Sequence, residues 1–322
     1  VGGVMGAGIA AAGFAAVNWP TMGKIAASWI ISPMLGGGIA ALFLAFIKFS
    51  IIYKEDKIAA GIKWVPVLIG LMAGVFSTYL ALKGLKKIIQ LDLSTSILIG
   101  VVIGVIVYAI TAPLIKWQSN GLENRNKSIK KLFAIPLVLS AALLSFAHGA
   151  NDVANAVGPL AAIVHTVEFG NVAGKVEIPT WVMIIGAIGI SFGLLLYGPK
   201  LIRIVGDQIT KLNPMRAYCV ALSAAITVII ASWLGLPVSS THIAVGGVFG
   251  VGFFREWDSA RRAKNTNFKN KKISKNIPSG ERRRRKLVRR SHFLTVISAW
   301  VITVPAAATL SGTIFLIISY FV

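Results

Sequence analysis

The chain has 322 residues, of which 56% are hydrophobic and 14% are charged, and its mean hydropathy is +0.76. Soluble domains carry about 25% charged residues, so this composition excludes an ordinary soluble domain and indicates a polytopic membrane protein. The formal net charge is +22, but 15 of the 33 basic residues lie at positions 255–292, which is typical of a cytoplasmic loop and not of a nucleic-acid-binding domain.

Enzymatic chemistry has no support in the sequence. The chain contains one cysteine, Cys219, so a disulfide within the chain and a zinc-ligand pattern are excluded. No nucleotide-binding glycine loop with its lysine is present, and no nucleophile–base pairing stands out. We therefore expect neither an enzyme nor a bound cofactor.

Apolar stretches of membrane-spanning length follow one another along the chain. In chain order they cover residues 1–17, 26–49, 64–82, 94–115, 132–164, 181–197, 217–234, 237–254 and 293–321. This pattern predicts an all-α protein that crosses the membrane many times.

Two of these regions are interrupted by polar residues. The stretch 132–164 has 33 residues, too many for one straight crossing, and contains His148-Gly149-Ala150-Asn151-Asp152 and then Gly158-Pro159. The segment 235–242 places a proline and four polar side chains between two apolar stretches. Irregular backbone at membrane depth occurs against protein or a wet cavity, and a pair of interrupted segments is typical of secondary transporters. We therefore predict discontinuous helices at both places.

The first interruption carries candidate cation ligands. An aspartate at the centre of a membrane helix costs roughly 2.5–3.5 kcal/mol, so Asp152 indicates a functional site. Sodium prefers oxygen ligands, which the Asp152 carboxylate and the amides of Asn151 and Asn155 provide. Asn151 and Asn155 are four residues apart and share a face if a helix continues through them. The alternative is that Asp152 only caps a helix that begins at Val153.

The second interruption carries candidate phosphate ligands. Ser239, Ser240 and Thr241 provide hydroxyl groups, and a helix that starts after Pro237 would point its positive end at an anion. We expect Asn151 to contribute as well. The alternative is an ordinary Ser/Thr helix start. No arginine interrupts these apolar stretches near the motifs, so cotransported cations would offset the charge of phosphate.

One histidine adjoins each polar motif. His148 precedes the Asn-Asp pair and His242 follows the Ser-Ser-Thr run. A histidine is suited to proton coupling because its ordinary pKa lies near neutrality. A hydrogen-bonded structural role is the alternative for both.

An internal repeat divides the chain. Residues 1–8 (VGGVMGAG) resemble residues 245–252 (VGGVFGVG), and Ser28-Trp29 with Pro33 resembles Ser298-Ala299-Trp300 with Pro305. We assign residues 1–49 to the end of a first repeat, 50–131 to connecting transmembrane helices and 132–254 to a second repeat with both motifs. Residues 255–292 form a basic loop, and 293–322 the final transmembrane helix. About 100 residues of the first repeat are expected upstream of Val1.

Loop charge predicts the orientation in a cell (inner) membrane. The basic segments 116–131 and 255–292 are expected on the cytoplasmic side, where the second is suited to lipid headgroups, and the acidic segment 165–178 on the outer side. An odd number of crossings separates the two related helices, which predicts repeats of inverted orientation.

The two motifs also resemble a known family. GANDVANAVGP at residues 149–159 and PVSSTH at residues 237–242 are similar to the signature sequences of the inorganic phosphate transporter (PiT) family. The resemblance implies a cation-coupled phosphate symporter with inverted repeats, driven by sodium or in some members by protons, and assembled as a homodimer. The first copy of each signature is not in this sequence.

Residues and resemblance together predict a secondary transporter that imports inorganic phosphate with sodium. The alternatives are a proton-coupled transporter of phosphate or of a related oxyanion such as sulfate, and, from another class, a membrane scaffold or receptor that does not transport. We expect phosphate, sodium and membrane lipids as partners, and no nucleic acid.

Overall fold

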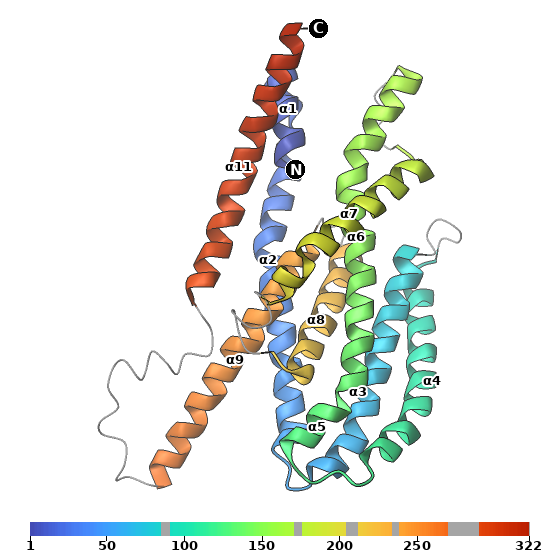
Figure 1. Ribbon diagram of the computed structural model, residues 1–322, viewed down its shortest axis with the longest axis vertical. Coiled ribbons are helices and arrows are strands. Elements are labelled where there is room, and N and C mark those ends of the chain that lie inside the picture. The colour runs from blue at the N-terminus through green and yellow to red at the C-terminus, as the bar shows by residue number, and fades with distance from the viewer. Residues whose placement is uncertain (85–90, 171–175, 204–211, 234–237, 270–289, 322) are drawn as a thin grey trace. The chain divides into compact units, whose positions relative to one another are not determined.

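The computed structural model describes residues 1–84, 91–170, 176–203, 212–233, 238–269 and 290–321, and these residues form helices and no strand (Figure 1). The α-helices are α1 (Gly2–Ala12), α2 (Trp19–Ile47), α3 (Lys57–Tyr79), α4 (Leu93–Ser119), α5 (Asn126–Leu132), α6 (Ala134–Phe169), α7 (Thr180–Arg203), α8 (Pro214–Trp233), α9 (Ser240–Lys269) and α11 (Arg290–Phe321). A 3-10 turn, η1 (Phe14–Ala16), follows α1. The π-helical turns η2 (Lys48–Ile52) and η3 (Leu80–Gly84) follow α2 and α3.

Six helical stretches of the described chain are long and apolar enough to cross a membrane. They are Trp19–Ile52, Lys57–Leu82, Leu93–Ser119, Thr180–Lys200, Pro214–Ala231 and Val301–Phe321, and α5 with the first part of α6 adds a seventh if this pair, bent by 45°, is one span. The predicted span 237–254 is not among them. Helix α9 begins with the polar residues Ser240, Thr241 and His242 and becomes charged from Arg255, so it is less apolar on average than the six spans.

The predicted interruption at residues 148–152 is wrong for the backbone. The helix α6 continues from Ala134 to Phe169, through both the Asn-Asp motif and Pro159. A polar side chain does not remove a backbone hydrogen bond, and a proline removes only one and can be tolerated in a membrane helix. The bend lies earlier, at Phe133 between α5 and α6.

The second predicted interruption agrees with the structure where the chain is described. Helix α8 ends at Trp233 and α9 begins at Ser240, with Val238 and Ser239 outside both helices. Residues 234–237, including Pro237 of the motif, lie outside the described residues.

The chain divides into two compact units. The first contains Val1–Ser28, Asn151–Leu201 and Arg289–Val322, and the second contains Trp29–Ala150 and Ile202–Val288. The boundary passes through α6, directly before the Asn-Asp pair. In the second unit the core centres on Tyr218 of α8, whose hydroxyl donates to the Leu68 carbonyl of α3 at 2.6 Å.

Glycines bring helices α3 and α4 into backbone contact, and the two helices lie side by side (Figure 1). A Cβ added to Gly74 would lie 2.8 Å from the carbonyl oxygen of Gly100, and one added to Gly70 would lie 2.7 Å from that of Gly104. Carbons do not approach that closely, so only glycine fits at these positions. The Gly-xxx-Gly spacing in both helices therefore has the close-packing role common in membrane proteins.

The two glycine-rich sequences of the internal repeat pack in the same way. In the first unit α1 lies along α11, and a Cβ on Gly6 would be 2.5 Å from the Cα of Ala308. In the second unit α9 lies along α2, and a Cβ on Gly250 would be 2.6 Å from the Cα of Gly37. Each glycine-rich helix thus packs on the proline-containing helix of the other predicted copy of the repeat: α1 on α11, and α9 on α2.

Candidate transport site

The Asn-Asp motif lies on α6. The backbone of His148, Asn151, Asp152 and Asn155 is helical, whereas the side chains of these four residues lie outside the described part of the chain. In a helix, residues three and four apart are neighbours on one side. The helical backbone therefore supplies the spacing that a shared ligand face for Asn151, Asp152 and Asn155 requires.

The Ser-Ser-Thr motif forms the start of α9. Ser239 is the N-cap: its Oγ accepts a hydrogen bond from the His242 backbone N–H at 3.3 Å, and its carbonyl accepts from the Ile243 N–H at 3.1 Å. This arrangement is the helix start that the sequence left open as an alternative. A hydroxyl that accepts one hydrogen bond can still donate its own proton, so the role of Ser239 as a phosphate ligand stays a prediction.

The next three residues differ in exposure. Ser240 is buried with 2% of its surface exposed, Thr241 is exposed, and His242 is half-buried. Successive residues of a helix point about 100° apart, so the three hydroxyls of the motif cannot all face one small anion from the helix alone. Ser239 precedes the helix, so the helical spacing does not fix the direction of its hydroxyl.

A small apolar cluster holds the start of α9 in place. Ile243 packs in it with Tyr79 of α3 and Val228 of α8, and Val238 and Leu144 of α6 pack against the cluster. Leu144 lies one helical turn before His148. The first half of α6, which leads into the Asn-Asp motif, therefore reaches the start of α9, where the Ser-Ser-Thr motif begins.

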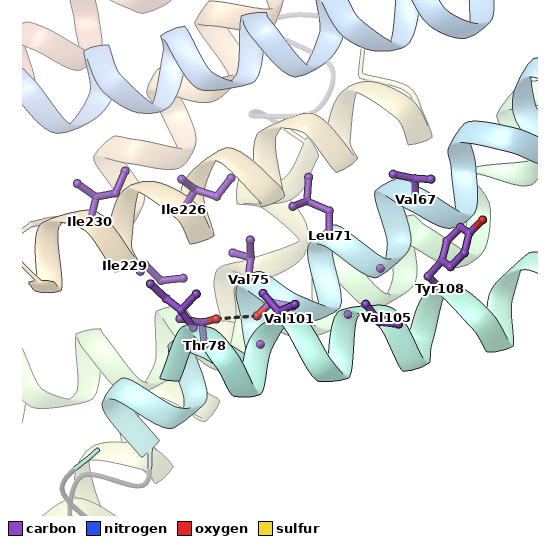
Figure 2. A pocket seen from close by; sticks show the side chains of 15 residues that line it. Val67, Leu71, Val75, Thr78, Val101, Val105, Tyr108, Ile226, Ile229 and Ile230 are labelled. Atoms are coloured by element: carbon purple, nitrogen blue, oxygen red, sulfur yellow. Dashed lines mark hydrogen bonds between the residues drawn. The ribbon is translucent and has the colours of Figure 1, made fainter. Parts of the chain in front are cut away.

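A cavity of 610 Å³ lies elsewhere, between α3, α4 and α8. Figure 2 shows its lining, which is mainly aliphatic: Val67, Leu71, Val75, Val101, Val105, Ile226, Ile229 and Ile230. The hydroxyl of Thr78 at its edge donates to the Gly74 carbonyl at 2.9 Å. All three helices are membrane-spanning stretches, so this cavity offers an apolar surface and not the donors that phosphate needs.

A charged cluster at the end of α2 was not predicted. Lys48 and Tyr53 both donate to the Asp258 carboxylate, and Arg262 completes the group. One signal was present in the sequence, because Asp258 is one of only three acids in the basic segment 255–292. Nothing in the sequence indicated its partner, since Lys48 is 210 residues away.

Three polar segments meet at this end of the second unit. Besides the Lys48–Asp258 pair, Asn124 accepts from the Lys57 backbone N–H at 2.9 Å and donates to the Glu55 carbonyl at 2.7 Å. The loop after α2, the loop after α4 and the charged part of α9 thus lie on one side. This is expected if α3 crosses the membrane and α4 crosses back.

Comparison with known proteins assigns the chain. The sequence profile described as "Phosphate transporter family" matches residues 1–311. The chain belongs to the phosphate transporter family. A protein from Helicobacter pylori named as a phosphate permease is 42% identical over 99% of this chain and 70% of its own length. A phosphate permease by name from Pyrococcus abyssi is 33% identical, covering 99% of this chain and 71% of its own.

A solved structure agrees with this assignment. It is titled "The sodium-dependent phosphate transporter", is 30% identical, and superposes with a TM-score of 0.79 over 100% of this chain and 72% of its own. The predicted family, the all-α transporter fold, the multi-pass membrane location and phosphate transport rather than enzymatic activity are thereby confirmed.

Proposed function

We propose that this member of the phosphate transporter family imports inorganic phosphate as a symporter driven by sodium. The observation that carries the proposal is the match along the whole chain to a structure whose title names a sodium-dependent phosphate transporter, at 30% identity and a TM-score of 0.79. Sodium, phosphate and membrane lipids are the proposed partners, together with a second copy of the chain.

Sodium would bind at the Asn-Asp motif of α6. Asp152 supplies the charged oxygen, and Asn151 and Asn155 supply amide oxygens from one side of the continuous helix. A carboxylate in the membrane interior is costly unless it is compensated, and a bound cation compensates it. The same requirement supports coupling, because Asp152 without sodium is the less stable state.

Phosphate would bind near the start of α9. Ser239, Ser240 and Thr241 provide hydroxyl donors, the helix start adds positive potential, and the Asn151 amide can donate from α6. Within the second unit, Leu144 in the first half of α6 packs against the cluster around Ile243 at the start of α9. Sodium bound nearby would offset the charge of phosphate, which makes the two substrates bind together.

The decisive experiment measures radiolabelled phosphate uptake into liposomes that contain the full-length protein, with sodium replaced by choline at constant pH. We expect uptake only with sodium and its loss in the Asp152→Ala variant at equal reconstituted amounts. Uptake that persists in choline and follows a proton gradient would replace sodium by protons and direct attention to His148 and His242. Competition by sulfate would broaden the substrate, and no transport under any gradient would favour a scaffold.

A further inference from the structure

The charged cluster joins two helices that are distant in the sequence. The Lys48 ammonium lies 2.6 Å from Oδ2 of Asp258, to which the Tyr53 hydroxyl also donates. Arg262 places its Nε 3.6 Å from Oδ1 of Asp258 and its guanidinium 3.1 Å from the centre of the Tyr53 ring. The Asp258 side chain is 6% exposed and that of Lys48 16%, so the pair is shielded from water.

The protonation states fit this geometry. Burial raises the pKa of Asp258, but the hydrogen bonds from Lys48 and Tyr53 outweigh it, so the pKa lies below the usual value and the carboxylate is charged. Burial and the bond to Asp258 raise the pKa of Tyr53 to about 12, so its hydroxyl stays a donor. A charged acceptor with two donors forms stronger hydrogen bonds than a neutral one.

Glycine packing joins the same two helices further along. A Cβ on Gly37 would lie 2.9 Å from the Gly246 carbonyl oxygen, and one on Gly36 would lie 2.8 Å from the side chain of Ile243. Helices α2 and α9 are thus in backbone contact from Ile243 to Gly250 and joined by charges at Asp258. Two separate attachments along one helix restrain both its position and its tilt.

We propose that Lys48, Tyr53 and Asp258, with Arg262, form a brace that positions α9 for phosphate binding. Helix α9 runs without interruption from Ser240 to beyond Asp258. The brace and the Ser-Ser-Thr motif therefore lie on one continuous helix, about 27 Å apart. Rotation or tilt at the braced end displaces the hydroxyls at the other. The brace residues are positioning residues, and this inference rests on phosphate binding at the start of α9.

The packing distinguishes a brace from a gate. A gate would require Lys48 and Asp258 to separate during each cycle. Backbone contacts at Gly37 and Gly250 leave no room for α2 and α9 to slide, and both helices lie together in the second compact unit from Trp29 onward. The pair therefore moves as one body, and the ion pair stays closed through the cycle.

The first test compares kinetic constants of the full-length protein in liposomes. For Asp258→Asn we expect the phosphate KM to rise by about ten-fold, because displacements near 1 Å far from a site can cost up to about 100-fold. The sodium concentration for half-maximal uptake, measured at saturating phosphate, should not change. A merely structural role would lower the amount of active protein without moving KM. An unchanged phosphate KM overturns the proposal.

Conservative variants keep the test valid if Asp258→Asn folds poorly. Tyr53→Phe removes one hydrogen bond and should raise the phosphate KM by about three-fold, and Asp258→Glu should restore most of the affinity. The matched control is Glu123→Gln, which disrupts an ion pair with Arg125 whose side chains are 68% and 75% exposed. It should leave the phosphate KM unchanged.

The second test replaces the ion pair by a covalent link. Lys48→Cys and Asp258→Cys are combined in full-length protein freed of other cysteines, in which Cys219, the one cysteine of these 322 residues, is replaced by alanine. A short bis-methanethiosulfonate joins the two thiols through disulfides that a reductant cleaves. Linkage should lower the raised phosphate KM of the double variant towards the wild-type value. Transport that stops on linkage and returns on reduction overturns the brace and establishes a gate.

The two proposals fail in different ways. Absence of sodium-driven uptake by the wild type contradicts sodium coupling, and the brace is then measured under whichever gradient drives the wild type. Normal wild-type uptake with an unchanged KM in Asp258→Asn and Tyr53→Phe contradicts the brace alone.

Discussion

Two helix pairs of this protein use the same sequence pattern with different results. Helices α1 and α11 and helices α2 and α9 each place a Val-Gly-Gly helix on a proline-containing helix, with glycines in backbone contact. Among the described residues, only the second pair has an ion pair as a further attachment. The reason is length: α9 has 30 residues and extends past Asp258, whereas α1 has 11 residues and ends at Ala12.

The difference separates two kinds of interaction. Glycine contacts depend on shape, are short-ranged, and occur in both helix pairs. The buried charges depend on one long helix meeting the end of another, and a buried ion pair is costly to break by removing one partner. The glycine contacts therefore determine how the helices meet in both pairs, and the extension of α9 adds the restraint on its orientation.

The largest effect is expected from filling the glycine contact. Gly37→Leu places a side chain where the Gly246 carbonyl and the Gly250 Cα lie, so we expect a loss of stability of about 3 kcal/mol or more. The neighbouring Gly38 is exposed and has nothing within 4 Å among the described residues. Gly38→Leu is thus the matched control. Thermal unfolding in detergent measures both, and equal midpoints would refute the packing.

Removal of the charge at Asp258 comes next. Asp258→Ala leaves the mostly buried Lys48 ammonium without its acid, which should cost about 3 kcal/mol. The exposed pair of Glu123 and Arg125 provides the comparison, and Glu123→Ala should change stability by about 0.5 kcal/mol or less. Urea unfolding of the two variants in the same detergent measures the difference. Similar losses would show that burial does not matter at Asp258.

A smaller effect is expected for one hydrogen bond of the brace. Tyr53→Phe keeps the ring under the Arg262 guanidinium and removes only the donor to Asp258. The expected loss of stability is about 1.5 kcal/mol, the value for a bond to a charged group. A double-mutant cycle with Asp258→Asn should show coupling, and simple additivity of the two changes would contradict a shared hydrogen bond.

The smallest effect is the pH dependence of that bond. The pKa of Asp258 is lowered on folding, so its contribution is present above the unfolded value of about 4 and is lost only as pH falls through the folded value. The pKa of Tyr53 is raised to about 12, so its contribution is present below about pH 10 and is lost as pH rises towards 12. The difference in melting temperature between wild type and Tyr53→Phe should therefore stay constant from about pH 5 to 9. A change of this difference with pH inside that range would show that another ionisable group takes part in the bond.

Much of the fold and the candidate site could be predicted from local pattern. Long apolar stretches predicted the spans because each helix satisfies its own backbone in lipid. The motifs around Asp152 and Ser240 indicated a family and candidate ligands, because a transporter must keep polar groups where the chain is otherwise apolar. The break predicted at Asp152 was wrong, because polar side chains leave the backbone hydrogen bonds of a helix in place, and α6 continues through the motif.

Sequence by itself determined the membrane class, since long apolar stretches are local features, and it predicted the repeat and the candidate ligands. Tertiary structure decided which glycines are in contact, as Gly37 and its neighbour Gly38 show. It also decided that Lys48 meets Asp258 across 210 residues. The physical reason is that helix formation depends on hydrogen bonds four residues apart, whereas close packing and ion pairing depend on which surfaces meet in space.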